Sequence, residues 1–135
     1  MNLDKIYIAG PMRKIPYLNF PAFDKAEAQL RDDGWDVINP AEMYRIGSDK
    51  PTDWLPEPHP EDHLLGWDLA ETILVDLERI VRECTAIFML RGWEVSLGAK
   101  AERAVAEWAE LRVIEQSDYE VGKAFIDFSF PLIDQ

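Results

Sequence analysis

The sequence has only one cysteine, two histidines and fourteen basic residues among its 135 positions. A single thiol excludes an internal disulfide and a zinc site built from several thiolates. No apolar run approaches the ~18 residues of a membrane-spanning helix, and the first residues lack the basic and apolar segments of a signal peptide. We therefore expect a cytoplasmic protein that does not associate with membranes.

Basic charge is scarce relative to acidic charge. Twenty-six acidic residues against fourteen basic ones give a net charge of −12 and a pI near 4.5. A protein that binds DNA or RNA as a polymer needs a basic field to displace counterions, so this balance argues against such a partner. Small anions remain compatible with it, because a helix N-terminus and one or two arginines can bind them locally. We expect a small-molecule ligand.

Hydrophobic residues make up 47% of the chain and charged residues 30%, which is ordinary for one globular domain spanning 1–135. Short apolar runs predict strands at 5–9, 35–39, 85–90 and 111–115, and amphipathic patterns predict helices at 19–34, 63–83 and 96–109. The proline-rich segment 40–62 is expected to be irregular, with Trp54 packed. The fold class is therefore α/β: a single-domain, Rossmann- or flavodoxin-like three-layer sandwich with a mostly parallel sheet.

Helical spacing also predicts which faces are buried. For the helix at 63–83, the expected buried stripe is Leu65, Leu69, Ile73, Leu77, Ile80 and Cys84. For the helix at 96–109, the expected inner residues are Ala101, Val105 and Trp108. The apolar tail is expected to dock on the domain or on a second subunit, which predicts a homo-oligomer of two or more chains. Its apolar residues are Tyr119, Phe125, Phe128, Phe130, Pro131, Leu132 and Ile133.

A turn follows the first strand directly. Ligands of parallel sheets bind beyond the carboxyl ends of the strands, which places segments 10–13, 39–41 and 91–98 around one crevice. Gly10 allows the backbone to approach a ligand, and Arg13 can hold a phosphate or carboxylate with its two-pronged guanidinium. A strand-ending turn with a surface arginine explains the same residues without a ligand.

Small residues open the late helix and precede a glutamate. Ser96 suits the N-cap, and Gly98 leaves the helix N-terminus accessible to an anion. Glu102 has Ala99 and Ala106 as helical neighbours, so its carboxylate faces space free of bulky groups and can act as a nucleophile or base. An ordinary cap and a solvated glutamate are the alternatives.

Asp76 borders the apolar stripe of its helix, where a carboxylate is costly unless it is paired or used. Pro60 interrupts the spacing of His59 and His63, so we expect no metal site there. Cys84 is expected in the core.

Three of these patterns together resemble a known family. Tyr7-Ile8-Ala9-Gly10-Pro11, then Asp76, then Gly98-Ala99-Lys100-Ala101-Glu102 with Ala106 are similar, in this order, to motifs of the nucleoside 2-deoxyribosyltransferase superfamily. The resemblance spans roughly 5–115. It implies that Glu102 attacks C1′ of a deoxyribonucleoside, that Asp76 contacts the departing base and handles its proton, and that Tyr7 orients Glu102. It implies no metal and no organic cofactor.

Position 96 favours one branch of that superfamily. The run Ser96-Leu97-Gly98 through Glu102 resembles the 2′-deoxynucleoside 5′-monophosphate N-glycosidases, whereas the transferases carry an acidic residue at the position of Ser96. A hydroxyl at a helix N-terminus tolerates a phosphate that a carboxylate would repel. Pro11 departs from this branch, which has serine there. The implied substrate-binding residues are Gly10, Pro11, Met12, Arg13, Ser96 and Gly98.

The expected function is cleavage of the N-glycosidic bond of a 2′-deoxynucleoside 5′-monophosphate, by hydrolysis or base exchange. The alternatives are a transferase acting on unphosphorylated nucleosides, a nucleotide-binding module without catalysis, and an interaction protein that uses the acidic loop at 40–62.

Overall fold

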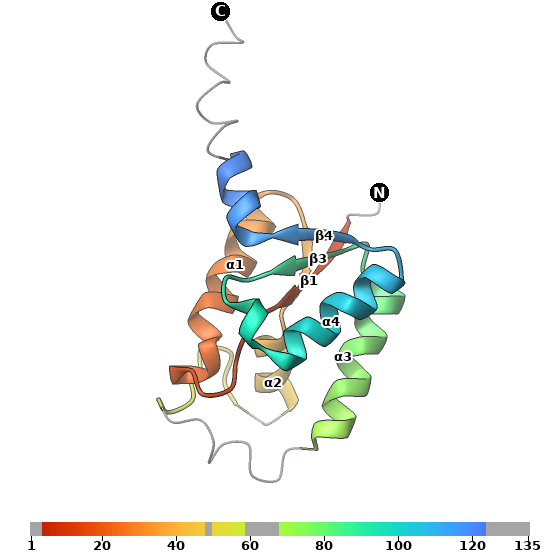
Figure 1. The fold of residues 1–135 in the computed structure, drawn as a ribbon. Helices are drawn as coiled ribbons and strands as arrows, with labels where there is room; N and C mark the ends of the chain where they lie inside the picture. The colour runs from red at the N-terminus through yellow and green to blue at the C-terminus, as the bar shows by residue number, and fades with distance from the viewer. Residues whose placement is uncertain (1–3, 48–49, 59–67, 124–135) are drawn as a thin grey trace, which may run out of the picture.

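The computed structural model describes residues 4–47, 50–58 and 68–123, and its centre is a four-stranded parallel sheet (Figure 1). The strands lie in the order β2 (Asp36–Ile38), β1 (Lys5–Ala9), β3 (Ala86–Met89) and β4 (Arg112–Glu115). All three neighbouring pairs are parallel, and Tyr7 of β1 lies in register with Ile38 and Ile87. This strand order is that of flavodoxin-like sheets, and it confirms the predicted fold class.

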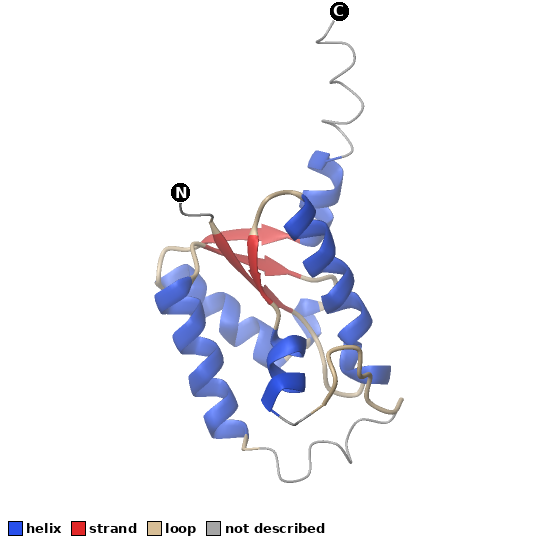
Figure 2. Ribbon diagram, turned by 180° about the vertical axis from the view of Figure 1, so that it is seen from behind, coloured by secondary structure: helices blue, strands red, loops and turns tan. Residues whose placement is uncertain are grey.

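Helices cover both faces of the sheet (Figure 2). Helix α1 (Phe20–Asp32) and a helix at 116–123 lie on one face, and α3 (Leu69–Glu83) and α4 (Leu97–Trp108) lie on the other. The pleat of β1 sends Ile6 and Ile8 into the core beneath α1 and sends Tyr7 into the core beneath α3 and α4. None of the helices in the described ranges is long and apolar enough to span a membrane.

The segment expected to be irregular begins with a helix, α2 (Pro40–Gly47), so that part of the prediction is wrong. Proline is tolerated in a first helical turn, and the Asn39 side chain caps the helix by accepting a hydrogen bond from the Ala41 N–H at 2.9 Å. The expected packing of Trp54 is confirmed. Its ring stacks on Tyr44 with centroids 5.9 Å apart and meets Phe20 edge-on.

The inner faces of the two covering helices differ from the prediction. On α4 the buried residues are Ala99 and Ala106, while Ala101 is exposed, Val105 is partly buried and Trp108 is 86% exposed. The reason is that α4 lies against the sheet through its small residues. On α3, Ile80 and Cys84 are buried as expected, but Leu69 and Ile73 are about half exposed at 48% and 46%. Leu65 lies outside the described residues.

The described part of the C-terminal tail packs on its own chain. The Tyr119 ring meets Phe88 edge-on at 5.4 Å, and its hydroxyl donates a hydrogen bond to Asp33. Asp33 also pairs with Lys123 at 3.1 Å. The remaining apolar residues of the tail, from Phe125 onward, lie outside the described residues, as do His59 and His63.

Candidate active site: a buried tyrosine and two carboxylates

Tyr7, Glu102 and Asp76 meet beneath the helices that cover the sheet, although they come from three distant parts of the chain. The Tyr7 side chain is fully buried, and its hydroxyl donates a hydrogen bond of 2.7 Å to Oε2 of Glu102. Glu102 stands on the inner face of α4, between Ala99 and Ala106, as its spacing predicts. Asp76 approaches from α3, near enough for the Tyr7 hydroxyl to stabilise its carboxylate as well. The three residues expected to be catalytic are therefore brought together.

Burial dominates the electrostatics of this group. It raises the pKa of Glu102 to about 8. The hydrogen bond from Tyr7 opposes this rise, and the negative charge of Asp76 adds to it. Burial raises the pKa of Asp76 to about 6, although the Tyr7 hydroxyl and the Arg79 cation both oppose that rise. Burial and the two carboxylates keep the pKa of Tyr7 well above 10, so Tyr7 remains a hydrogen-bond donor. Between these two carboxyl pKa values the pair holds one proton.

The N-terminus of α4 lies one turn before Glu102. Oγ of Ser96 accepts a hydrogen bond from the Ala99 N–H at 3.1 Å, so this serine is the N-cap, as predicted. Its hydroxyl hydrogen remains available to donate. At Gly98 an added Cβ would meet no atom within 4 Å, so the backbone there is open.

The turn after β1 has a packing role that sequence reasoning did not anticipate. A Cβ on Gly10 would lie 2.8 Å from Leu90, so glycine is required for β1 and the end of β3 to pack together. Pro11 is buried and Met12 partly buried, and Met12 packs against the core beneath α1. Arg13 is exposed and forms no ion pair with any residue in the described ranges, so its guanidinium is available to an anion.

An unusual loop holds this turn in place. Tyr17, Leu18 and Asn19 are three consecutive non-glycine residues with positive φ, between 51° and 60°. Left-handed backbone costs roughly 1–2 kcal/mol for such residues, so tertiary contacts must hold it. Leu18 is buried, and the Asn19 side chain donates a hydrogen bond of 2.9 Å to the Pro11 carbonyl. Asn19 therefore precedes α1, as predicted, but its side chain supports the turn at 10–13 instead of capping the helix.

Residues 4–115 match a family described as Domain of unknown function (DUF4406). The chain belongs to this family. The matched region contains all three residues of the buried group, the turn after β1 and the N-terminus of α4. No curated protein and no solved structure matches the chain significantly.

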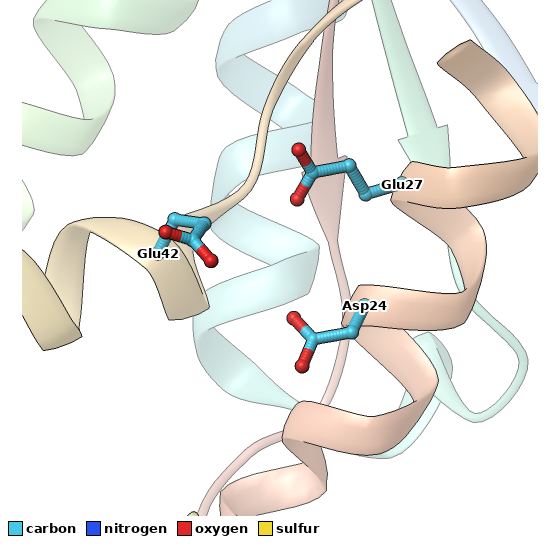
Figure 3. Close-up of side chains that lie close together, drawn as sticks. All are labelled: Asp24, Glu27 and Glu42. Atoms are coloured by element: carbon cyan, nitrogen blue, oxygen red, sulfur yellow. The ribbon is translucent and has the colours of Figure 1, made fainter. Parts of the chain in front are cut away.

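A second cluster of charged groups in this DUF4406 domain lies on the α1 side of the sheet. Asp24 and Glu27 on α1 and Glu42 on α2 have carboxylate oxygens within 4.8 Å of one another, and the three side chains face a common space (Figure 3). Arg45, which is only 2% exposed, binds Asp24 at 2.8 Å and Glu42 at 3.1 Å.

Asn39 completes this network from the end of β2. Its amide donates hydrogen bonds to Asp24 at 3.1 Å and Glu27 at 2.9 Å. The Nε of Arg45 donates to the Trp54 carbonyl at 2.9 Å. Because these donors already engage the carboxylates, the cluster ties α1, β2, α2 and the Trp54 segment together, and Asn39 does not join the buried tyrosine and carboxylates.

Replacing Gly10 with alanine is expected to destabilise the DUF4406 domain by roughly 1–3 kcal/mol, because the new methyl group overlaps the buried side chain of Leu90. Gly98→Ala is the matched control, since its methyl group enters open space at a helix start. Urea unfolding monitored by circular dichroism measures both. If the free energy of unfolding of Gly10→Ala lies within about 0.5 kcal/mol of that of the original chain, the structure accommodates the methyl group and this packing role is wrong.

Arg45→Met is expected to lower the free energy of unfolding by roughly 2–4 kcal/mol, because it removes the buried cation that pairs with Asp24 and Glu42. Arg82→Met is the control, since the Arg82–Glu78 pair is exposed and such pairs contribute about 0–1 kcal/mol. Thermal unfolding of both variants measures the difference. Equal melting temperatures for the two would show that the network does not stabilise the fold.

Proposed function

We propose that the protein cleaves the N-glycosidic bond of a 2′-deoxynucleoside 5′-monophosphate, with Glu102 as the nucleophile. The observation that carries the proposal is the hydrogen bond of 2.7 Å between Tyr7 and Glu102, with Asp76 beside it. Glycosidases commonly use two neighbouring carboxyl groups with different pKa values, one as the acid and the other as the nucleophile.

The chemistry takes two steps. An ionised oxygen of Glu102 attacks C1′, the bond from C1′ to the base breaks, and the departing base nitrogen takes the proton of Asp76. In the second step a water molecule attacks C1′ and gives its proton to the Asp76 carboxylate, which releases the sugar and restores Glu102. If a second base replaces water, the same intermediate leads to base exchange.

Burial raises the pKa of both carboxyl groups, so the pair holds one proton near neutral pH. Attack requires the state in which this proton is on Asp76 and Glu102 is ionised. The Tyr7 hydroxyl faces both carboxylates, so it stabilises whichever one is ionised while the proton changes place.

The 5′-phosphate is assigned to the N-terminus of α4 and the turn after β1. The open backbone at Gly98 and the Ser96 hydroxyl can donate hydrogen bonds to an anion, and the helix dipole favours negative charge there. Arg13, exposed and without an ion pair in the described ranges, can add a charge-assisted contact.

Pro11 favours a second candidate function. Proline has no backbone N–H, so the turn offers one donor fewer to a phosphate than a serine would. A transferase that exchanges bases between unphosphorylated deoxynucleosides needs the same pair of carboxylates without the phosphate contacts.

The test is base release from four matched substrates: a 2′-deoxynucleoside 5′-monophosphate, its unphosphorylated nucleoside, and the two ribose counterparts. Chromatography of the free base over a long incubation, with and without a second base, measures hydrolysis and exchange. We expect release from the deoxynucleotide first. Exclusive use of the unphosphorylated deoxynucleoside would favour the transferase, and binding of nucleotide without any release would favour a non-catalytic module.

A further inference from the structure

We propose that the outer face of α4 is the contact through which two copies of this chain pair, with their α4 helices antiparallel. Four apolar residues form a continuous stripe on that face: Leu97, Ala101, Ala104 and Trp108. Leu97 is 82% exposed and Trp108 is 86% exposed, and both alanines are exposed as well. Helix α4 lies over the sheet beside α3 (Figure 1). Because Ala99 and Ala106 are the buried residues of α4, the exposed stripe lies on the opposite face, away from the sheet.

The stripe is symmetric about its own centre. With a rise of 1.5 Å per residue, Leu97 and Trp108 each lie about 8 Å from a point between Glu102 and Arg103, and the two alanines lie about 2 Å from it. A two-fold axis through that point places Leu97 of one copy against Trp108 of the other and places alanine against alanine. Small residues at the centre allow two helices to approach within about 8 Å, and antiparallel helices align their dipoles favourably. A surface that is complementary to itself fits a second copy of the chain.

Opposite charges on one flank of the stripe lie close to this symmetry, offset by one residue. Lys100 and Glu107 are two turns apart and share that flank. Lys100 is exposed and makes no ion pair within the described ranges, and Glu107, 56% exposed, uses only Oε1 to bind Arg103 at 2.9 Å. In the antiparallel arrangement Lys100 of one copy lies about 3 Å along the axis from Glu107 of the other, which gives two opposite-charge contacts per dimer. A parallel arrangement would bring neither pair together.

The neighbouring helix supplies further apolar area. Helix α3 packs beside α4 and exposes Leu74 by 64% and Val81 by 50%. Stable dimers bury about 800 Å² on each partner, more than one helix of twelve residues provides, so side chains of α3 can complete the contact.

Analytical ultracentrifugation of the full chain tests the proposal. Concentrations from about 1 to 200 µM in about 0.15 M salt cover dimers with a Kd in the micromolar range. We expect a dimer whose Kd rises at least about 100-fold in Trp108→Glu, because this variant puts a charge in place of the aromatic side chain that packs against Leu97 of the other copy. Val121→Glu is the matched control, because Val121 is 69% exposed on the helix at 116–123, and we expect it to leave the Kd unchanged. Circular dichroism and thermal unfolding of each variant show that it is folded.

A charge exchange tests the orientation. Lys100→Glu and Glu107→Lys are each expected to weaken the dimer about 10-fold, and the double variant is expected to restore it to within about 3-fold. A chain that is monomeric at every concentration overturns the proposal, including the case in which Trp108 is shielded by another segment of its own chain. A dimer that tolerates Trp108→Glu overturns it too, and a double variant as weak as the single ones overturns the antiparallel arrangement.

Discussion

We expect Glu102→Gln to lower base release from the preferred deoxynucleotide by at least about 1,000-fold, because the amide keeps the shape of the side chain but cannot form a bond to C1′. Glutamine can still accept the Tyr7 hydrogen bond, so the geometry of the buried group is retained. Glu107→Gln is the control on the same helix, since Glu107 is exposed and faces away from Tyr7. Chromatographic rates for the two variants, measured on matched protein concentrations, give the comparison.

The roles within the group separate in the same assay. Asp76→Asn is expected to lose about 100-fold or more, because the base then departs without a proton. A substrate whose base is a better leaving group should recover most of that loss, and it should recover none of the loss in Glu102→Gln. If Glu102→Gln keeps a tenth or more of the original rate, Glu102 is not the nucleophile.

Glu102→Gln is also expected to stabilise the fold at alkaline pH. In the folded chain the pKa of Glu102 is raised from 4.5 to about 8, so the folded state binds a proton more tightly than the unfolded state does. This contribution to stability is therefore complete below about pH 4.5 and is lost as the pH rises through 8. At roughly 1.4 kcal/mol per pKa unit, the original chain should lose roughly 3–5 kcal/mol relative to Glu102→Gln between pH 4.5 and 9.

Urea unfolding at pH 5, 7 and 9 measures this difference. The two chains should have similar stability at pH 5, and the glutamine variant should be the more stable one at pH 9. Asp32→Asn corrects for the general effect of net charge, because it removes one exposed carboxylate from the end of α1, away from the α4 contact. Parallel stability curves for Glu102→Gln and the original chain would mean that Glu102 titrates as a solvated carboxyl.

The buried group could be predicted because each member follows a short-range rule. The alternation of β1 sends Tyr7 to one face of the sheet, and the spacing of Ala99, Glu102 and Ala106 aligns the glutamate with small buried residues. The order of strands and helices follows from the same local patterns. The resemblance over three motifs then linked residues that periodicity alone could not connect.

What sequence reasoning missed depends on contacts between distant segments. Arginine side chains usually lie at the surface, so the sequence does not predict that Arg45 is buried. Its burial depends on the packing of α1, α2 and the Trp54 segment against one another. Helical spacing predicts Trp108 on the inner face of α4 with Ala101 and Val105, but the close approach of α4 to the sheet leaves room there only for small residues. The three left-handed residues at 17–19 have no sequence signal at all, since only Asn19 tolerates that conformation well.

The central position of β1 in the sheet also determines when the buried group of Tyr7, Asp76 and Glu102 can assemble during synthesis. Its pairing with β2 joins residues 31 apart, such as Lys5 and Asp36, whereas its pairing with β3 joins Ile6 to Ala86, 80 residues later. Contacts of short separation form first, so the unit of β1, α1 and β2 can fold while the ribosome is still producing the rest of the chain. Until β3 emerges, one edge of β1 is unpaired, and until α4 emerges the Tyr7 hydroxyl lacks its acceptor Glu102. A nascent chain arrested before Ala86 therefore exposes an apolar strand edge, the kind of surface that chaperones bind and that aggregates when unprotected.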